Sequence, residues 1–507
     1  MTSPSERIGA LIAQVRKERG LSQIQFAKLL QTSQSAINRI ENGKQNLTMD
    51  TMGRISDVLN KQLLSVSGNV VNLQVEGEHE LKGEITLKTS KNAAVGLLCA
   101  SLLNYGVTKF EHVPKIEEVF RIIETLESIG VSIKWYGNNN LEIRRPPKLN
   151  LEKINAAAAR KTRSVLMFMG PLMHDYTNFK IPYAGGCKLG ARIVEPHLFA
   201  LEQFGVAVEA KENNYHISVK KRPAGRIVMY ETSDTATENA LLAAARFPEE
   251  TIIEFASANY AIQDVCFFLQ KLGVKIDGVG NTKLTIHGLS MIKKNVTYSL
   301  AEDPVEAMFF VAAAITTNSK ITIRRVPIEF MSLELLKLEK MGMHFDISER
   351  YKAENDKTDL VDIVVHKHNG KLKALPHKLH PNVFPAGINA DNIPYFVPIC
   401  TVLKGTSLIH DWMYENRAIY YAELSKIGAN INLADPYRVY IQGPTKFTRA
   451  DITCPPALRP ASLLLIGMLA APGVSILRDI YTINRGYEDI AERLNSLGAK
   501  ITVLNQP

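Results

Sequence analysis

The sequence predicts an α/β fold of the α+β kind, made of six repeated units and preceded by a small all-α domain. Two patterns predict it: apolar residues at helical spacing near the N-terminus, and six later helices that each end in glycine and lead directly into a strand. At 507 residues the chain is too long for a single hydrophobic core. We therefore expect at least two domains, the first of them small and helical.

The N-terminal part reads as short helices separated by polar turns. A helix over residues 23–30 is expected to bury Phe26, Leu29 and Leu30, and the turn after it leads into a second helix over residues 34–42. Two further short helices are predicted beyond this pair. A polar stretch then separates them from a strand-rich sequence.

The remainder of the chain repeats one αβ signature, in which an apolar residue, a glycine and a small or apolar residue join a helix to a strand. Glycine takes the left-handed conformation that closes the helix, and an alternating β pattern follows at once. A single copy would mean little, whereas six at near-constant spacing indicate an internally repeated fold. The six glycines, 68 to 86 residues apart, are Gly130, Gly205, Gly273, Gly342, Gly428 and Gly498.

Composition and charge narrow the class of protein. Apolar residues make up 46% and charged residues 22% of the chain, as in an ordinary globular protein. The formal charge of +9 fits a phosphate-bearing partner, either a nucleotide or DNA. The five cysteines form no metal-ligand or disulfide pattern, so we expect no metal and no other cofactor. The N-terminus lacks a signal-peptide core and every apolar run is too short to cross a bilayer, which predicts a cytoplasmic protein without a membrane partner.

Several short motifs stand at defined places within the repeats. They are Lys91-Asn92-Ala93-Ala94, Gly185-Gly186-Cys187-Lys188-Leu189-Gly190-Ala191-Arg192, Thr237-Glu238-Asn239, Glu415-Asn416-Arg417, Leu458-Arg459 and Arg485-Gly486-Tyr487-Glu488. In this order and at these distances they resemble the enolpyruvyl transferases, most of all the UDP-N-acetylglucosamine 1-carboxyvinyltransferase (MurA-like) family. Any one motif alone would be weak.

The resemblance implies a two-lobed fold, with six αβ units arranged as an inside-out α/β barrel. It places one lobe at residues 72–89 with 301–505 and the other at residues 90–300, after a helix-turn-helix domain at residues 1–68. The implied reaction moves the enolpyruvyl group of phosphoenolpyruvate to a hydroxyl of UDP-N-acetylglucosamine or a related nucleotide acceptor, with release of phosphate. Phosphoenolpyruvate and a nucleotide acceptor are then the expected small-molecule partners.

Basic groups are the first requirement of this chemistry, because phosphoenolpyruvate is small and highly anionic. Guanidinium groups bind carboxylate and phosphate through two parallel hydrogen bonds. The resemblance implies that Lys91 takes part in catalysis and that Asn92 binds substrate beside it. For any single arginine the alternative is an ordinary surface ion pair. Substrate binding is implied for five arginines, namely Arg163, Arg192, Arg417, Arg459 and Arg485.

Cys187 stands in a Gly-Gly loop beside Lys188. A neighbouring cation lowers the pKa of a thiol, and flanking glycines favour an exposed loop. The resemblance implies that Cys187 transfers a proton to the methylene carbon and takes part in product release. The alternative, a buried and inert thiol, suits Cys99, Cys266 and Cys400 in their apolar contexts.

An acid–base group must also take the proton from the attacking hydroxyl. The family places an aspartate after a Phe-Pro pair, and here Phe384-Pro385 is followed by an altered loop that reaches Asp391. Asp391 is the first candidate for this group. Asp303, counted also among the substrate-binding residues, is the second candidate. A helix-capping role is the alternative for both aspartates.

Positions expected to bind the nucleotide part of the acceptor depart from the family pattern. Asp234 stands just before Thr237-Glu238-Asn239, where backbone amides are expected to meet a diphosphate, and its charge would oppose that anion. Glu195 and Ala457 replace acidic residues of the pattern. The phosphoenolpyruvate side is kept and the acceptor side has changed, which favours a different acceptor over loss of catalysis.

Residues 23–43 resemble the helix-turn-helix of the phage-repressor-like (XRE) family, whose second helix lies in the major groove. Gln34, Ser35 and Asn38 fall on the outward face of that helix, and glutamine and asparagine amides bind adenine edges. Residues 1–68 carry nine basic and five acidic side chains, enough basic charge for phosphate contacts. Double-stranded DNA is therefore an expected partner, with a protein-docking module as the alternative. A homodimer stays open, because repressor-like domains commonly act as dimers.

Three functions remain open on the sequence. The first is an active enolpyruvyl transferase with a non-standard acceptor, whose attached domain regulates its own operon. The second is a transcription regulator whose enzyme-like part is a degenerate nucleotide-sugar sensor. The third is a peptidoglycan-biosynthesis enzyme of ordinary specificity, acting in cell-wall synthesis, whose N-terminal domain has no role. The retained motifs favour activity over the sensor, and the acceptor-side departures count against the third.

Overall fold

The computed structural model describes residues 9, 12, 13, 16, 21–30, 32–45, 51, 55, 71–185 and 193–505. The chain divides into two compact units, one made of residues 1–70 with the short segment 134–137 and residue 507, and the other made of residues 71–133 and 138–506. Each unit is described by itself. Among the described residues, no helix combines the length and the apolar character needed to cross a membrane.

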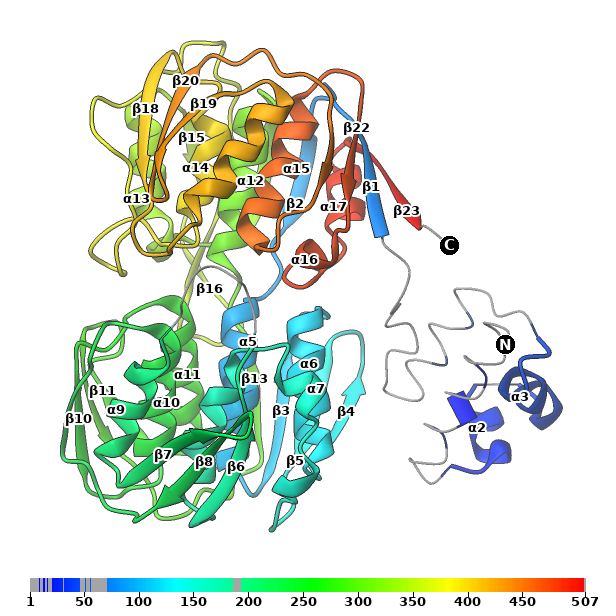
Figure 1. Ribbon diagram of the computed structural model, residues 1–507, viewed down its shortest axis with the longest axis vertical. Helices are drawn as coiled ribbons and strands as arrows, with labels where there is room; N and C mark the ends of the chain where they lie inside the picture. The colour runs from blue at the N-terminus through cyan, green and yellow to red at the C-terminus, as the bar shows by residue number, and fades with distance from the viewer. Residues whose placement is uncertain are drawn as a thin grey trace. The chain divides into compact units, whose positions relative to one another are not determined.

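The first unit contains helices α2 (Gln23–Leu29) and α3 (Gln34–Glu41), drawn in blue in Figure 1. Ser22 and Gln25 form a reciprocal capping box at the start of α2, and the hydroxyl of Ser33 caps α3. The caps satisfy backbone N–H groups that have no partner inside the helices. The two predicted helices therefore form where the polar turns end.

An apolar core and one buried ion pair hold this unit together. The Nε and NH2 atoms of Arg16 donate to the carboxylate of Glu41 at 2.5 and 3.0 Å. Leu29 was predicted to be buried, and this is wrong: it is 54% exposed, because its neighbours on α2 already fill the inner face. The core residues are Ile12, Phe26, Ala27, Leu30, Ile37, Ile40 and Ile55.

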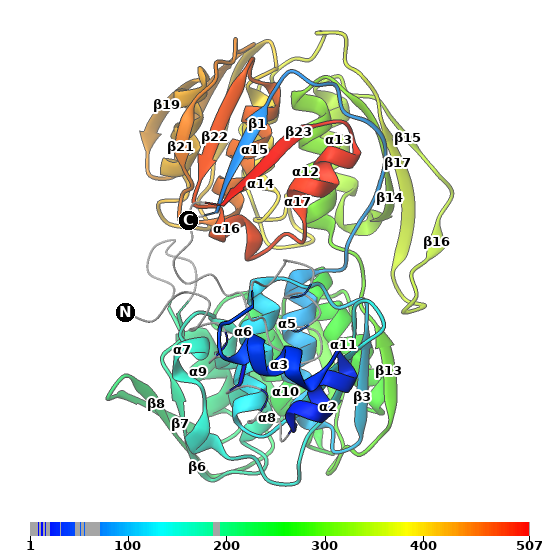
Figure 2. The same ribbon diagram turned by 90° about the vertical axis from the view of Figure 1, so that its right-hand side faces the viewer.

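The second unit is an α/β structure with two lobes, seen one above the other in Figures 1 and 2. Three sheets belong to the upper lobe, which we call lobe one. Their strands, in spatial order, are β21 (Asp451–Thr453), β22 (Val474–Arg478), β1 (Val71–Glu76) and β23 (Lys500–Asn505); β15 (Phe345–Ile347), β17 (Asp359–Val365), β14 (Lys320–Pro327) and β2 (Lys82–Thr86); and β18 (Gly405–His410), β20 (Arg438–Gly443) and β19 (Asn430–Asp435). A short strand, β16 (Tyr351–Lys352), also pairs with β17.

Three further sheets belong to the lower lobe, which we call lobe two. Their strands, in spatial order, are β13 (Val296–Ser299), β3 (Val107–Glu111), β5 (Asn140–Arg144) and β4 (Ser132–Tyr136); β11 (Lys275–Asp277), β12 (Lys283–His287), β10 (Glu250–Glu254) and β9 (Arg226–Val228); and β6 (Asn178–Pro182), β8 (Asn214–Val219) and β7 (Val206–Lys211). Among the described strands, no sheet joins the two lobes. The chain crosses between them twice, from β2 into lobe two and from β13 back into lobe one.

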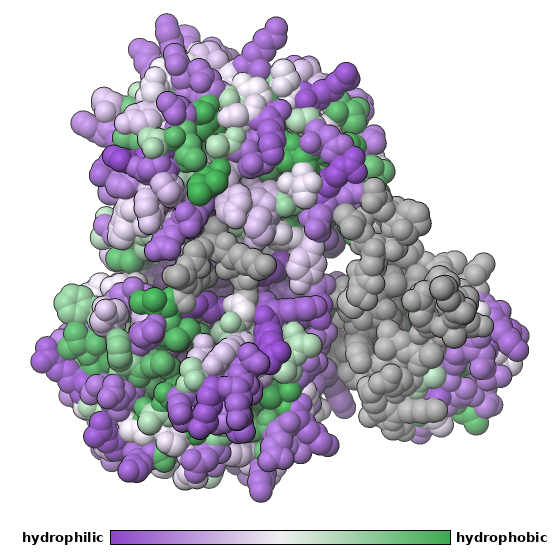
Figure 3. Space-filling model, viewed as in Figure 1, coloured by the Kyte–Doolittle hydropathy of each residue, from purple (hydrophilic) through white to green (hydrophobic). Residues whose placement is uncertain are grey.

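Apolar helices lie inside each lobe and the sheets lie outside. In lobe one, α12 (Pro304–Thr316), α14 (Ile393–Cys400) and α15 (Leu458–Ala470) contact one another and are buried along almost their whole length. In lobe two, α5 (Lys91–Ala100) and α10 (Asp234–Ala244) are buried in the same way. A helix that is apolar on all sides is stable only in such a position. Hydrophilic side chains cover most of the face seen in Figure 3, as this arrangement requires.

Further helices pack between the inner helices and the sheets or cap the lobes. They are α6 (Glu117–Ser128), α7 (Ala156–Ala159), α8 (Met169–Leu172), α9 (Glu195–Glu202), α11 (Tyr260–Leu272), α13 (Ser332–Lys340), α16 (Tyr481–Asn484) and α17 (Ile490–Ser496), with 3-10 helices η1 (Ser101–Leu103), η2 (Leu151–Lys153), η3 (Ser164–Phe168), η4 (Ile328–Phe330) and η5 (Ala418–Ile427).

The predicted repeat is confirmed by these elements. All six predicted glycines have positive φ, between 83° and 109°. The strands that follow them are β4, β7, β11, β15, β19 and β23, and each lies at the edge of a different sheet. One copy of the sequence signature therefore corresponds to one sheet of the unit.

Candidate active site

The N-terminus of α5 carries two of the predicted residues, Lys91 and Asn92. Ser90 caps this helix by accepting a hydrogen bond from the backbone N–H of Ala93 at 3.1 Å. The amide of Asn92 donates to the hydroxyl of Tyr260 at 2.9 Å. A lysine is unfavourable at a helix N-terminus, where the helix dipole is positive. The position of Lys91 is therefore explained by its surroundings and not by the helix.

Lys91 lies among charged groups from both lobes. Burial is the main cause that lowers the pKa of its ammonium group. The carboxylates of Glu118 and Asp391 act in the opposite direction, whereas Arg485 and Arg459 lower the pKa further. Three of the predicted basic groups and the first acid–base candidate are thus brought together. We call Lys91, Glu118, Asp391, Arg459 and Arg485 the central cluster.

Glu118 joins the two lobes and was missed in the sequence analysis. Its carboxylate accepts one hydrogen bond from Nε of Arg485 at 2.6 Å and another from the hydroxyl of Thr162 at 2.6 Å. Burial alone would raise the pKa of Glu118, but Lys91 and Arg485 hold it below its usual value. Glu118 is therefore ionised, and it offsets part of the positive charge that would otherwise repel across the cluster.

Arg459, the second residue of α15, orients the first acid–base candidate. It donates through NH2 to Asp391 at 3.2 Å and through NH1 to the hydroxyl of Tyr487 at 3.0 Å. Burial acts to raise the pKa of Asp391, and Arg459, Arg417 and Lys91 together lower it. Asp391 is thus an ionised carboxylate held beside cations.

Asp303, the second candidate, differs from Asp391 in its proton affinity. Its side chain caps α12 by accepting from the N–H of Val305 at 2.8 Å, so the capping role weighed for it is present. Burial raises the pKa of Asp303 to about 6, although Arg459 acts to lower it. Of the two aspartates, Asp303 therefore binds a proton more tightly.

Arg417 is buried in an ion pair close to the first acid–base candidate. Its side chain is 1% exposed, and it donates to Asp411 at 2.5 and 2.7 Å and to the carbonyl of Ala390 at 2.7 Å. The guanidinium group also stacks on Tyr414, 4.3 Å from the ring centre. This buried ion pair holds the backbone next to Asp391, and the substrate-binding role of Arg417 stays a prediction.

The remaining predicted residues of this site are Arg163, Cys187 and Arg192. Arg163 follows Thr162, the residue that binds Glu118, and its guanidinium group donates to the carbonyl of Ile193. Cys187 and Arg192 lie outside the described residues. Burial raises the pKa of the thiols of Cys99, Cys266 and Cys400, as expected for inert cysteines.

Asp234 lies at the start of α10, where the acceptor side was expected. Its carboxylate accepts hydrogen bonds from the hydroxyl of Ser257 at 2.6 Å and from the amide of Asn259 at 2.9 Å. Burial raises the pKa of Asp234, and these two hydrogen bonds act against that rise. A carboxylate with built-in donors therefore stands at the positive end of this helix.

Hydrogen bonds continue from Asp234 across to lobe one. The carbonyl oxygen of the Asn259 side chain accepts from the amide of Asn389 at 3.3 Å. The side-chain oxygen of Asn389 in turn accepts from the backbone N–H of Asp391 at 2.9 Å. The acceptor side and the central cluster are therefore connected through two asparagines.

An exposed aromatic pair includes Tyr230, which stands four positions before Asp234. The rings of Phe199, on α9, and Tyr230, between β9 and α10, lie 5.1 Å apart. Phe199 is 43% exposed and Tyr230 is 65% exposed. Exposed aromatic rings of this kind stack with nucleobases.

A hairpin of lobe one contacts lobe two at a separate place. It runs from β16 to β17, and Figure 2 shows β16 at the level where the lobes meet. The carboxylate of Glu354 lies 2.6 Å from Nε2 of His112. The amide of Asn355 donates to Asp264 at 3.3 Å. These contacts hold the lobes together in addition to the pair of Arg485 and Glu118.

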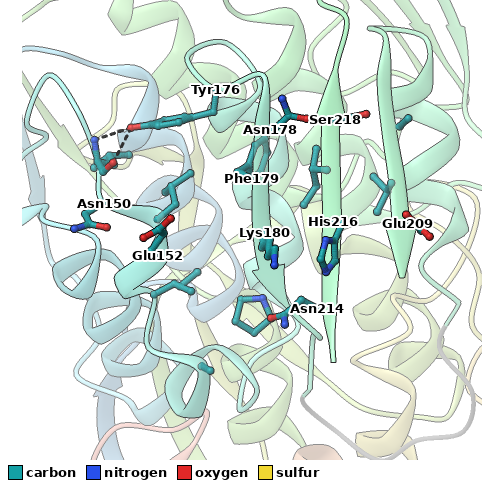
Figure 4. A pocket seen from close by; sticks show the side chains of 18 of the residues that line it. Asn150, Glu152, Tyr176, Asn178, Phe179, Lys180, Glu209, Asn214, His216 and Ser218 are labelled. Carbon is teal, nitrogen blue, oxygen red and sulfur yellow. Dashed lines mark hydrogen bonds between the residues drawn. The ribbon is translucent and has the colours of Figure 1, made fainter. Parts of the chain in front are cut away.

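A hollow of about 1290 Å³ lies on the polar face of the sheet β6–β8–β7 (Figure 4). Asn150, Glu152, Lys180 and His216 are among the side chains that line it. The hydroxyl of Tyr176, which closes one end, bonds to the backbone of Leu149. The predicted site residues that the structure describes do not line this hollow, so it is distinct from the central cluster.

In the first unit, the three predicted DNA-contacting residues lie on one exposed face of α3. Gln34, Ser35 and Asn38 are exposed, whereas Ile37 and Ile40 are buried. The side-chain oxygen of Asn38 accepts from Asn42 at 2.9 Å. This matches the predicted orientation of the second helix.

Comparison with known proteins assigns both units to families. Residues 75–494 match the family model of EPSP synthase (3-phosphoshikimate 1-carboxyvinyltransferase), and residues 12–65 match a helix-turn-helix model. The UDP-N-acetylglucosamine 1-carboxyvinyltransferase of Helicobacter pylori strain Shi470 is 30% identical over 440 residues, which is 86% of this chain and 99% of that protein. The enzyme of the same name from Campylobacter jejuni strain 81-176 is also 30% identical over 440 residues, with the same coverage.

Solved structures agree on the fold. The enolpyruvyl transferase NikO from Streptomyces tendae superposes with a TM-score of 0.73 at 20% identity, covering 87% of this chain and all of that one. An EPSP synthase from Acinetobacter baumannii gives 0.66 at 16% identity, covering 86% of this chain and all of that one. At these identities the similarity establishes the fold alone.

Proposed function

Because the chain belongs to the EPSP synthase family of enolpyruvyl transferases, we propose that it moves the enolpyruvyl group of phosphoenolpyruvate to a hydroxyl of a nucleotide acceptor. UDP-N-acetylglucosamine or a related nucleotide is the acceptor class. The hydroxyl oxygen bonds to the central carbon of phosphoenolpyruvate while its proton goes to a base and the methylene carbon gains a proton. Loss of that carbon-bound proton and of phosphate then regenerates the double bond.

The central cluster is the observation that carries this proposal. Lys91, Arg459 and Arg485 converge from separate parts of the sequence, and the carboxylates of Glu118 and Asp391 offset part of their positive charge. Like charges repel, so a cation cluster is costly unless an anion occupies it. A phosphate and a carboxylate on one small substrate match two guanidinium groups and an ammonium group.

Asp391 is the base in this mechanism. Its pKa is lowered by Arg459, Arg417 and Lys91, so it is ionised and able to accept a proton at neutral pH. A base of low pKa is weak, and its effect depends on being held in position. Arg459 and the Arg417–Asp411 pair supply that positioning. Asp303 stays the second candidate.

The acceptor side favours a nucleotide substrate. Its phosphate groups are not expected to bind as a diphosphate at the start of α10. Asp234 already occupies the start of that helix, and its hydrogen bonds to Ser257 and Asn259 need no ligand. A diphosphate there would face a carboxylate. Phe199 and Tyr230 offer a surface on which a base can stack. Among the acceptors in the class, UDP-N-acetylglucosamine is therefore the less favoured.

Phosphate release from phosphoenolpyruvate, measured over a panel of UDP-sugars and other nucleotides, tests the proposal. We expect turnover with at least one nucleotide acceptor and little without an acceptor. If no acceptor supports turnover, while a UDP-sugar binds tightly and alters affinity for DNA, the enzyme function is wrong. The regulator with a nucleotide-sugar sensor would then replace it.

The helix-turn-helix domain is proposed to bind double-stranded DNA through α3. Gln34→Ala and Asn38→Ala should each relax sequence choice, because an amide that bonds a base edge contributes about 1–3 kcal/mol of discrimination. Lys28→Ala or Lys44→Ala should weaken binding to all sequences alike, as loss of a phosphate contact does. Fluorescence anisotropy at several salt concentrations distinguishes the two effects. Absence of salt-dependent binding by the full chain would leave the protein-docking alternative.

A further inference from the structure

Two histidines and an aspartate gather on the surface of lobe one, at strands β15 and β17 (Figure 2). Phe345 lies opposite Val365 in the antiparallel pair. His344 therefore lies opposite His366, whose backbone N–H donates to the carbonyl of His344 at 3.2 Å. Asp346 is two residues after His344, so its side chain points to the same face of the strand.

The polar atoms of the three side chains lie close to one another. The imidazole rings stack with centres 5.0 Å apart and planes at 27°. Nε2 of His366 is 2.6 Å from one carboxylate oxygen of Asp346, and Nε2 of His344 is 3.4 Å from the other. One ligand atom from each residue lies within 4.8 Å of the others. Tetrahedral zinc, with bonds of about 2.0–2.2 Å, holds its ligand atoms about 3.3 Å apart.

We propose that His344, Asp346 and His366 bind a divalent transition-metal cation of the zinc class. Two imidazole nitrogens and one carboxylate oxygen are the protein ligands, and water fills the fourth position. Small rotations of exposed side chains bring the three atoms to zinc spacing. The sequence predicts no metal site, because the two histidines are 22 positions apart and only the strand pairing brings them together.

Asp346 supplies the one negative charge among the three proposed ligands, and its carboxylate contacts both imidazole rings. Lys320 is a nearby cation that opposes a metal ion, but it supplies no ligand atom to the cluster.

A bound cation would stabilise the edge of a sheet. β15 has three residues and forms the edge of the sheet β15–β17–β14–β2. Edge strands are open on one side. A cation shared between β15 and β17 links this edge strand to its neighbour. Slower hydrogen exchange in β15 on adding zinc is the structural consequence.

Isothermal titration of the full chain with zinc chloride, in a buffer without phosphate or chelator, tests the proposal. We expect the wild type to bind one equivalent that His366→Ala loses, and Asp346→Asn to weaken that equivalent at least ten-fold. His287→Ala is the matched control: His287 lies 3.4 Å from Glu250 on another strand pair, with two ligands instead of three. This control should bind zinc as the wild type does.

Cobalt absorption gives a second readout. Tetrahedral cobalt(II) should give visible bands in the wild type and the His287→Ala control, and none from this site in His366→Ala. Circular dichroism checks that the variants are folded, and the exposed positions of the side chains make this expected. Equal zinc stoichiometry and affinity in the wild type, His366→Ala and Asp346→Asn would overturn the proposal.

Discussion

The two sides of the candidate active site differ in how charge is arranged. On one side, Lys91, Arg459 and Arg485 converge and share two carboxylates. On the other, Asp234 stands at a helix N-terminus with its own hydrogen-bond donors in place. The cations on the first side are suited to bind an anionic substrate. On the second side, the hydrogen bonds of Asp234 are already satisfied by residues of the protein. A fold can therefore keep the site for one substrate while changing the site for the other.

The largest expected effect comes from removing a cation of the central cluster. Arg485→Ala removes the guanidinium group that pairs with Glu118 at 2.6 Å, and it leaves a bound dianion with one cation fewer. Loss of one partner from a buried charge pair costs about 2–5 kcal/mol, which corresponds to a fall of at least about 30-fold in kcat/KM. Phosphate release measures this fall.

Arg478→Ala is the matched control for that variant. Arg478 is seven positions earlier and pairs on the surface with Asp451 at 2.6 Å. Exposed ion pairs contribute about 0–1 kcal/mol, so activity and stability should change little. Equal activity of the two variants and the wild type would contradict the assignment of the anion site.

Two substitutions at Cys187 test the proton transfer proposed for this residue separately from the binding of phosphoenolpyruvate. Cys187→Asp should keep more activity than Cys187→Ala, because a carboxyl group still carries a proton where a methyl group does not. General acid–base catalysis contributes about 10²–10⁴-fold. Single-turnover rates at saturating substrate measure the difference. Equal rates for the two variants would remove Cys187 from proton transfer.

Asp303 and Asp391 differ in pKa, and this difference tests which one is the base. The raised pKa of Asp303, about 6, means that the folded protein binds a proton where the unfolded chain has lost it. Its contribution to stability therefore falls as pH rises from about 4 to about 6 and is constant above that. Asp303→Asn keeps a side-chain oxygen for the cap, and it should be more stable than the wild type above pH 6 by about 2–3 kcal/mol.

The activity of Asp303→Asn also tests which of the two aspartates is the base. With Asp391 as the base, Asp303→Asn should keep most of the wild-type kcat/KM, because the group that accepts the proton is unchanged. Urea unfolding and initial rates, both measured from pH 4 to 8, check the two expectations. A fall of about 10²-fold or more in kcat/KM for Asp303→Asn, with the fold intact, would make Asp303 the base.

The smallest expected effect concerns Asp234. Asp234→Ser removes a negative charge from the start of α10 and leaves the backbone N–H groups of that helix for an anion. A charge at a helix N-terminus is worth about 1 kcal/mol, so use of UDP-N-acetylglucosamine relative to the preferred acceptor should rise about five-fold. The ratio of kcat/KM values measures this. An unchanged ratio would mean that Asp234 does not select the acceptor.

The sequence predicted the parts of this molecule that depend on local pattern. Six glycines with positive φ mark the repeats, since the left-handed conformation that closes a helix leaves its own signature. The motifs at Lys91, Arg459 and Arg485 were visible because their neighbours in the chain are distinctive. For the same reason α2 and α3 could be placed from their polar turns.

The remaining features depend on partners far away in the chain. Glu118 looks like an ordinary charge in the first turn of α6 until Arg485 of the other lobe is placed beside it. Arg417 stands in a recognisable motif, but its buried ion pair with Asp411 is not visible from that motif. Leu29 is exposed because the inner face of α2 was already filled. Burial and pairing are properties of the packed structure, so the sequence pattern alone did not determine them.

Binding of phosphoenolpyruvate tests the difference between the two sides most directly. Isothermal titration in the presence of the preferred acceptor should give the wild type and Asp234→Ser similar affinities for phosphoenolpyruvate, and Arg485→Ala an affinity at least about 30-fold lower. This result would show that the cation side binds phosphoenolpyruvate independently of the changed acceptor side. Equal affinity of Arg485→Ala and the wild type, or an equal loss in Asp234→Ser and Arg485→Ala, would contradict it.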